Sequence, residues 1–362
     1  MEISIMAKCS HKLTICLIFA CTILALVLMV QTARAGQEPS VTIDNIMAHL
    51  AFDKSYKKAL LNGKILSTGM PEMEQLREEL AVSAVMLVVR APMEKVVAAY
   101  LDGESFRQND DTIAYHMIRS TQETGAPAKE DFKTIGYTTG ELSEVKKLME
   151  FKGGAAFNFS RDEIEQFRGV DPKDPAIQEK VSLILRHILT ERCQSYFSRG
   201  LIADKPYERD RGKQSFPGRE LTVAVASTQL LEKHFPDFYQ SLLKYPENIG
   251  KHIKNDVYWF KNRLDNRPVF QLCHYMADIR SHYAIVAELR FYVEHTYNSM
   301  LTVIGCVPFE GGTVVFCINR TFTDQVAGFG SNLKRNIGRR RIEDAVSKHF
   351  ANLRSLLEAG KN

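Results

Sequence analysis

A period-two alternation of apolar and polar residues predicts strands in the last third of the chain. In the segment 284–295, one face carries the apolar set Ala287, Leu289, Phe291 and Val293, together with His295. The opposite face carries Glu288, Arg290, Tyr292 and Glu294, which predicts that this face meets water. Two further apolar segments, 300–307 and 313–322, continue the strand pattern.

From about Asp324 the apolar spacing changes to 3.6 residues, which predicts one long amphipathic helix. Its apolar stripe consists of Val326, Leu333, Ile337, Ala345, Val346, Phe350, Leu353 and Leu357. A sheet with one dry face needs a cover. At roughly 1.5 Å per residue this helix is about 50 Å long, which suffices to lie across the sheet. We expect the helix to roof the sheet and to leave room beneath it.

The upstream segments complete an α+β pattern. Strands are predicted at 79–90, 112–118, 132–137, 257–260 and 269–276. Helices are predicted at 43–61, 93–101, 139–151, 161–169, 177–200, 221–231 and 236–245. The predicted order is therefore strand, helix, strands, helical block, five strands and long helix, with helices segregated from an antiparallel sheet.

The N-terminus has the pattern of a secretory signal. Basic residues precede 18 largely apolar residues, 13–30, and Ala33-Arg34-Ala35 has the small residues of a cleavage site. We expect export, to the periplasm or the outside, after cleavage near Ala35. The alternative is an uncleaved anchor, because 18 residues is the lower limit for spanning a bilayer. Cleavage would lower the formal net charge from +4 to +2, and this balance does not indicate nucleic acid as a partner.

Four cysteines remain beyond the predicted signal, and none forms a C-x-x-C pair. A two-residue turn at Gly311-Gly312 would place Cys306 opposite Cys317, and export would permit a disulfide between them. A three-residue turn would separate the two thiols. The alternative interpretation is that both are small apolar core residues.

The order of these segments resembles that of START and Bet v 1-type (SRPBCC-like) helix-grip domains. The matching pieces are Val82 to Val89 running into Pro92, the strands from Val257 to Phe322, and the helix from Asp324. The resemblance implies a curved antiparallel sheet gripped by the C-terminal helix, and a cavity for an apolar ligand such as a lipid, sterol or hopanoid-like molecule.

The resemblance also suggests a division of the chain. We expect a signal peptide at 1–35, an N-terminal helical segment at 36–78, and a helix-grip-like domain made of 79–138 and 251–362. Residues 139–250 form a helical insertion, which is longer than such domains usually carry at this place.

Six residues are candidates for ligand binding in such a cavity. His274 and His295 lie on apolar strand faces and would anchor a polar head group, although an isolated histidine there is more often a hydrogen-bonded core residue. Arg90 ends the first strand and would pair with a ligand carboxylate or with a protein acid. Apolar contacts are expected from Phe291, Leu333 and Ile337.

Catalytic patterns are missing from the sequence. It contains no His-Glu-x-x-His, Gly-x-Ser-x-Gly, Gly-x-Gly-x-x-Gly or P-loop motif, and its ten histidines show no metal-ligand spacing. We therefore expect no metal and no cofactor. The favoured function is an exported carrier of an apolar ligand with peripheral membrane contact. The alternatives are a cell-envelope protein-interaction module and a hydrolase or isomerase that uses the cavity.

Overall fold

The computed structural model describes residues 41–70, 79–101, 111–120, 125–203, 205–324 and 331–359, and for 79–82, 100, 101 and 331–336 it describes the backbone alone. The chain divides into two compact units, residues 1–41 and 42–362, and every element below belongs to the second. The predicted signal at 1–35 lies outside the described residues.

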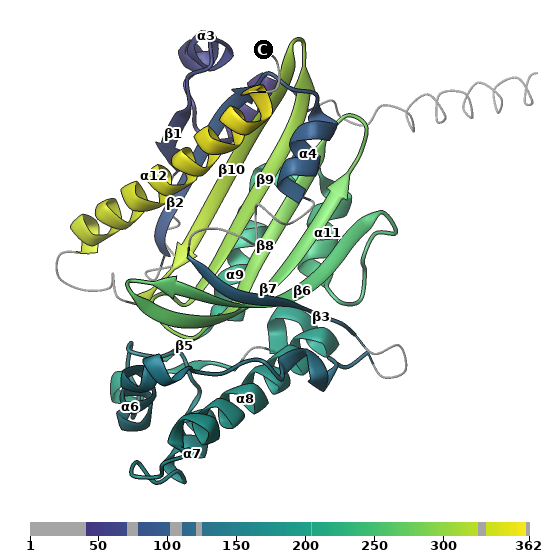
Figure 1. Ribbon diagram of the computed structural model, residues 1–362. Helices are drawn as coiled ribbons and strands as arrows, with labels where there is room; N and C mark the ends of the chain where they lie inside the picture. Colours follow the sequence, from purple (N-terminus) through teal and green to yellow (C-terminus); the bar gives the residue numbers. More distant parts are fainter. Residues whose placement is uncertain are drawn as a thin grey trace, which may run out of the picture. The chain divides into compact units, whose positions relative to one another are not determined.

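One antiparallel sheet of eight strands organises the second unit, in the spatial order β1-β2-β10-β9-β8-β7-β6-β3 (Figure 1). The strands are β1 (Leu66–Gly69), β2 (Glu79–Val89), β3 (Thr112–Ile118), β6 (Ile253–Leu264), β7 (Arg267–Ile279), β8 (Ala284–Val293), β9 (Ser299–Phe309) and β10 (Gly312–Phe322). The strands β6 to β10 form a continuous meander, as the alternation in the sequence predicts.

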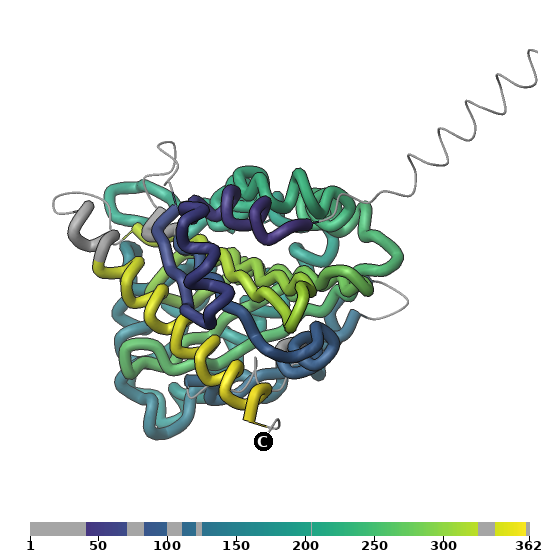
Figure 2. The backbone as a smooth tube through the Cα atoms, turned by 90° about the horizontal axis from the view of Figure 1, so that it is seen from above, coloured from purple at the N-terminus to yellow at the C-terminus, as the bar shows by residue number. Residues whose placement is uncertain are grey.

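Helices cover both faces of this sheet (Figure 2). On one face, α12 (Ser331–Glu358) lies against β1 and β2, and α4 (Met93–Leu101) lies beside it. Phe350 and Leu353 of α12 join an apolar cluster with Val85 and Leu87 of β2. This arrangement confirms the predicted α+β class, with a curved antiparallel sheet and a long C-terminal helix packed on it.

The opposite face is covered by helices inserted between β3 and β6. The helix α9 (Pro217–Ala226) contacts β8, β9 and β10, and α11 (Pro236–Lys244) contacts β7. The other α-helices among the described residues are α2 (Ile43–His49), α3 (Lys57–Leu61), α6 (Leu142–Glu150), α7 (Arg161–Arg168), α8 (Ile177–Arg199) and α10 (Gln229–His234). The short strands β4 (Tyr207–Glu208) and β5 (Gln214–Ser215) pair with each other in this block.

The prediction that one face of β8 meets water is wrong. Glu288 is 2% exposed and Glu294 is fully buried. The inserted helices cover one side of β8. On the other side, residues of β8 belong to the apolar cluster that α4 and α12 complete. The alternation therefore distinguishes two buried environments, one apolar and one polar.

Two predicted segments differ locally from the structure. The expected strand at 132–137 is a 3-10 turn, Lys129–Phe132, followed by irregular backbone, because its polar backbone groups bond to side chains of α8. The expected helix at 43–61 is interrupted, since Ala51 has a positive φ of 58° between α2 and the next helical turn.

The hairpin between β9 and β10 turns one residue earlier than predicted. Gly312 pairs with Phe309, so the turn residues are Glu310 and Gly311. The register therefore places Cys306 opposite Val315, and Cys317 opposite Ile304. Both cysteines are buried free thiols in the apolar cluster under α12 and α4.

The core beneath the inserted helices has no spare room at Gly305. This residue of β9 pairs with Phe316 of β10, and a Cβ added to it would lie 2.0 Å from Cζ of the Phe316 ring. The ring is fully buried, so it cannot swing away into solvent.

We predict that Gly305→Ala lowers the free energy of unfolding by about 1–3 kcal/mol, because the added methyl group overpacks the core. Urea denaturation of the variant measures the loss. Gly169→Ala is the matched control, since Gly169 ends α7 with a negative φ and has open space around its Cβ position. Equal stability of the two variants would contradict the prediction.

Candidate functional site

A cavity of about 540 Å³ lies between α12 and the strands β6 to β10. The sheet contributes Asn262, Leu264, Gln271, Glu288, Arg290, Met300, Thr302, Ile304, Cys317 and Asn319. Asp111, Tyr297 and the α12 residues Ala345, Val346, Lys348, His349, Phe350 and Asn352 complete the lining. The helix α12 contacts β1 and β2 at one side of the sheet and borders this space with residues 345–352, and we take the space as the candidate site.

The strands supply a polar floor to this cavity. Arg290 of β8 donates a hydrogen bond from Nη1 to Oε1 of Gln271 in β7. The hydroxyl of Tyr297 donates to the same oxygen at 3.2 Å. The Nη2 atom of Arg290 lies 3.6 Å from Oε2 of Glu288, which is an ion pair longer than an ordinary hydrogen bond. Asn319 donates to Thr302 Oγ1 at 3.1 Å nearby.

The hydrogen bonds of this floor are incomplete. Within the described residues, three buried atoms of the lining have no partner: Nε of Arg290, Nε2 of Gln271 and Oδ1 of Asn262. Buried polar groups in native proteins are nearly always paired, so each exception calls for an explanation. Three exceptions in one cavity mark it as a site that a ligand or water completes.

Burial changes the protonation of the floor. Removal from water raises the pKa of Glu288 to about 7, although the charge of Arg290 pulls it down. Burial also disfavours the charge of Arg290, but Tyr297 and Glu288 raise its pKa above the ordinary value. At neutral pH the cavity therefore contains a fixed cation and a carboxyl group that exchanges its proton.

The walls of the cavity are apolar. Ile304 and Cys317 from the sheet are nearly fully buried, and Phe350 from α12 is 1% exposed. Lys348 and His349 of α12 are exposed, as is Asp111, so these residues lie where the cavity meets solvent. The arrangement suits a molecule with an apolar body and one polar end.

The structure places His274 on the opposite face of the sheet from this cavity. Its Nδ1 atom lies 2.7 Å from the hydroxyl of Tyr196 in α8, and its Nε2 atom bonds to Asn255. Burial lowers the pKa of His274 to about 3, so the ring is neutral and has a partner at each nitrogen. Phe291 stacks on Tyr196 with the ring centroids 3.8 Å apart. The expectation that His274 and Phe291 face the C-terminal helix is therefore wrong.

His295 also lies among the inserted helices. Its Nε2 atom lies 2.9 Å from the carbonyl oxygen of Pro268, and its Nδ1 atom 2.7 Å from the Thr296 hydroxyl. Its ring meets Phe157 edge-on. Burial lowers the pKa of His295 to about 4. The residue is a hydrogen-bonded core histidine, which is the alternative that the sequence left open.

The other candidates lie outside the cavity lining as far as their side chains are described. Arg90 is exposed, and its Nη2 donates to the carbonyl oxygen of Leu61 at 2.8 Å. Ile337 is 48% exposed on α12. Leu333 is a backbone position of α12 whose side chain lies outside the described residues. Of the six predicted residues, none with a described side chain lines the cavity.

Sequence reasoning missed Glu288 and Arg290 because it assigned their face of the strand to solvent, and it gave Gln271 no role. The sequence contained a signal for these residues: Glu288 and Arg290, of opposite charge, are two residues apart in a strand that is otherwise largely apolar. A β-bulge then complicates the pattern, since Cys273 pairs with Arg290 but Leu272 pairs with Tyr292, which leaves Phe291 unpaired in the ladder. After the bulge, Tyr292 and Glu294 turn toward the inserted helices.

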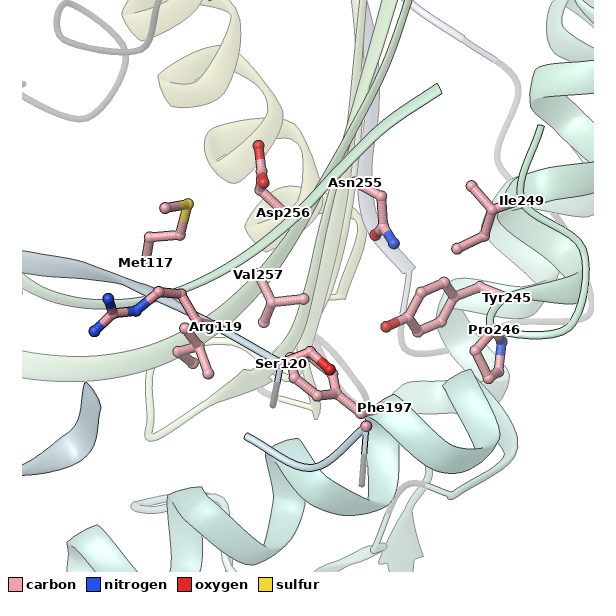
Figure 3. Close-up of a pocket in the computed structure, with 12 residues that line it drawn as sticks. Met117, Arg119, Ser120, Phe197, Tyr245, Pro246, Ile249, Asn255, Asp256 and Val257 are labelled. Carbon is pink, nitrogen blue, oxygen red and sulfur yellow. The ribbon is translucent and has the colours of Figure 1, made fainter. Parts of the chain in front are cut away.

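A second hollow, of about 470 Å³, lies at the sheet edge formed by β3 and β6 (Figure 3). Met117, Arg119 and Ser120 lie on one side of it, and Tyr245 and Pro246 lie on the other. Asn255 lines this hollow, and its Oδ1 atom is hydrogen-bonded to Nε2 of His274. Its lining contains none of the buried, unpartnered polar atoms that distinguish the cavity beside α12.

Metal chemistry has no site among the described residues, where no group of three or more His, Cys, Asp or Glu side chains could hold an ion. The helices in the described ranges also lack the combination of length and apolar character that crossing a membrane requires. Comparisons with protein-family models, curated proteins and solved structures yield no match to this chain.

We predict that Glu288→Gln changes how stability depends on pH. The folded state raises the pKa of Glu288 from 4.5 to about 7, so it binds more protons than the unfolded state between these values. The wild-type protein therefore loses stability as pH rises from about 4.5 to 7, by roughly 3 kcal/mol from this group. The variant lacks this loss, so its unfolding free energy should improve relative to wild type over that interval.

Urea denaturation at pH 4.5 and pH 8 measures this relative change. Glu165→Gln is the control, because Glu165 is half exposed on α7 and pairs with Arg168 at the surface. Surface pairs contribute little, so we expect a relative change below about 0.5 kcal/mol there. The same pH dependence in wild type and Glu288→Gln would refute the assignment of a buried, proton-exchanging carboxyl.

Proposed function

We propose that this chain is a binding protein for an apolar small molecule, such as a lipid, a sterol or a hopanoid-like compound, held between the sheet and α12. The observation that carries the proposal is the cavity of about 540 Å³ with Ile304, Val346 and Phe350 in its wall. Ligand sites typically have volumes of about 300–1,000 Å³, with mostly apolar walls and a few polar groups. The cavity has this size and this composition.

The architecture supports the same proposal by analogy. An eight-stranded antiparallel sheet with a long C-terminal helix packed on it has the outline of a helix-grip domain. Such domains hold their ligands between the sheet and that helix. The inserted helices do not obstruct this placement, because they cover the other face of the sheet. Fold alone does not determine function, so the cavity carries more weight than the outline.

Export is part of the proposal. The apolar run at 13–30 and the small residues at 33–35 are the sequence features that support it. A carrier outside the cytoplasm would receive its ligand from a membrane or deliver it there, through peripheral contact or an envelope protein partner.

An enzyme is the second candidate function, and one observation favours it. A hydrolase or isomerase would need an acid or base of suitable pKa in the cavity, and Glu288 has its pKa raised to about 7 by burial, with Arg290 beside it. The interaction module has less support. It would require side chains to fill the space under α12, where the cavity lies.

We predict that the protein purified from its native host carries a lipid-like molecule in roughly equimolar amount. Native mass spectrometry of the intact protein, followed by organic extraction and mass analysis, identifies it. The neutral apolar fluorophore N-phenyl-1-naphthylamine should bind the emptied protein, and the extracted molecule should displace it. An empty extract together with no binding of the fluorophore would overturn the proposal.

We further predict that Thr302→Trp lowers the affinity for N-phenyl-1-naphthylamine at least tenfold. Thr302 is half-buried on β9 and lines the cavity, so an indole ring there occupies the space of the ligand. Ser355→Trp is the matched control, because Ser355 is exposed on α12 and is not part of the lining. Thermal unfolding confirms that both variants are folded. Equal loss in both variants would place the bound fluorophore outside the cavity.

A further inference from the structure

We propose that Arg290 and Gln271 bind the carboxylate head group of an amphipathic ligand, and that Glu288 takes up a proton from solvent as this head group enters. The inference rests on the proposed function and names the chemical class of the ligand: a long-chain carboxylic acid, bound as its anion. Its apolar chain lies along the wall formed by Ile304, Val346 and Phe350.

The first argument is a surplus of hydrogen-bond donors. Arg290 offers five N–H groups, Gln271 two and Tyr297 one. The acceptors within this group are Oε1 of Gln271, which already accepts from both Arg290 and Tyr297, the hydroxyl oxygen of Tyr297, and the carboxyl oxygens of Glu288. Among the described lining residues, the donors Nε of Arg290 and Nε2 of Gln271 have no acceptor, and the acceptor Oδ1 of Asn262 has no donor. A ligand end that accepts hydrogen bonds would satisfy the two unpaired donors, which lie on the neighbouring strands β7 and β8.

The second argument is the looseness of the existing ion pair. The 3.6 Å between Arg290 Nη2 and Glu288 Oε2 exceeds the roughly 2.7–2.9 Å of a charge-assisted hydrogen bond. Glu288 is 3% exposed in its side chain, so it cannot move out to solvent to release the cation. Arg290 keeps 14% of its side chain exposed, and it lines the cavity. A guanidinium presents a planar fork that matches a carboxylate in a bidentate manner.

The third argument is charge balance. One buried cation accommodates one monoanion, and a second carboxylate beside the buried Glu288 would place two like charges next to each other. Protonation of Glu288 removes this conflict, because the neutral carboxyl also gains an O–H donor for the incoming head group. The proton comes from solvent, so binding at neutral or higher pH is coupled to proton uptake.

Other titratable groups also face this space. Asp111 and Lys348 line its solvent side, and α12 also brings His349, whose pKa is lowered by desolvation. Burial raises the pKa values of Tyr297 and of the thiols of Cys273 and Cys317, so these groups stay neutral between pH 6 and 8. Glu288 is therefore the group expected to change its charge near pH 7.

The experiment compares dodecanoate with 1-dodecanol by isothermal titration calorimetry, using the protein purified from its native host and freed of lipid. The two ligands have the same chain, and only dodecanoate has an acceptor-only anionic end. We expect dodecanoate to bind at least tenfold more tightly at pH 7. Arg290→Met should lower the affinity for dodecanoate roughly 10- to 100-fold, because it removes charged hydrogen bonds. The affinity for dodecanol should change less than twofold.

Arg340→Met on the exposed surface of α12 is the matched control and should leave both affinities unchanged. Gln271→Leu is a second test that keeps both charges, and it should weaken dodecanoate binding at least threefold. In wild type, the affinity for dodecanoate should fall above pH 7, by up to about tenfold per pH unit, because Glu288 must then bind a proton. Glu288→Gln should abolish this dependence.

Each outcome decides the inference. Equal binding of dodecanol and dodecanoate, both blocked by Thr302→Trp, overturns the head-group assignment and leaves the carrier function standing. A pH dependence unchanged in Glu288→Gln overturns the proton uptake. Binding of neither dodecyl ligand, with N-phenyl-1-naphthylamine still bound, overturns the ligand class alone. Loss of that fluorophore as well overturns the carrier function too.

Discussion

The width of the sheet compared with the width of one helix is the constraint on which the rest of this structure depends. Strands in a sheet are about 4.8 Å apart, so the first and last of eight strands are roughly 34 Å apart. A helix with its side chains is only about 10–12 Å across. Because α12 lies against β1 and β2, it cannot also seal the strands β6 to β9 on the same face. The cavity lies beside α12, over strands of this face that neither α12 nor α4 covers completely.

The opposite face shows what full coverage looks like. There the inserted helices bring buried pairs into contact, such as Arg192 of α8 with Glu163 of α7, joined by two hydrogen bonds of 2.8 and 2.7 Å. Phe291 stacks directly on Tyr196, and Gly305 leaves room for the ring of Phe316 and nothing more. Breaking a buried ion pair of this kind typically costs about 3–5 kcal/mol. The face under the inserted helices is thus densely packed, although the buried Tyr292 hydroxyl has no partner there, while the other face retains unfilled space and unpaired atoms of Arg290, Gln271 and Asn262.

Sequence periodicity was sufficient for the order of elements and insufficient for the faces. The alternation in 284–295 correctly predicted a strand, and the 3.6-residue spacing after Asp324 correctly predicted the C-terminal helix, which begins at Ser331 as far as the structure describes it. Alternation alone cannot tell which face meets which neighbour. The apolar face with Leu289 was assigned to α12, but it packs against the inserted helices, whose position depends on tertiary contacts far apart in the sequence.

The same limit explains why the predicted histidines do not line the cavity beside α12. A histidine on an apolar face is informative only when the covering element is known, and His274 is covered by Tyr196, 78 residues away in the chain. Charged residues in a strand are usually interpreted as solvent-exposed, which hid Glu288 and Arg290. The free-energy cost of burying unpaired charges on a central strand would have been a useful signal. β8 lies in the middle of the sheet, with four strands on one side of it and three on the other, so charges on it must either reach water or find buried partners.

The polar floor therefore has a physical reason to be where it is. Apolar side chains at Glu288, Arg290 and Gln271 would let the unsupported part of the sheet collapse onto α12, since apolar surfaces without water or ligand between them favour contact. Polar groups resist this collapse because leaving them without hydrogen bonds costs roughly 1–3 kcal/mol each. The open cavity lowers the stability of the protein, because hydrogen bonds and apolar contacts are left unmade. A molecule that supplies acceptors to Arg290 and apolar surface to Phe350 would form both. A single binding event would then complete the hydrogen bonds of the floor and the packing of the roof.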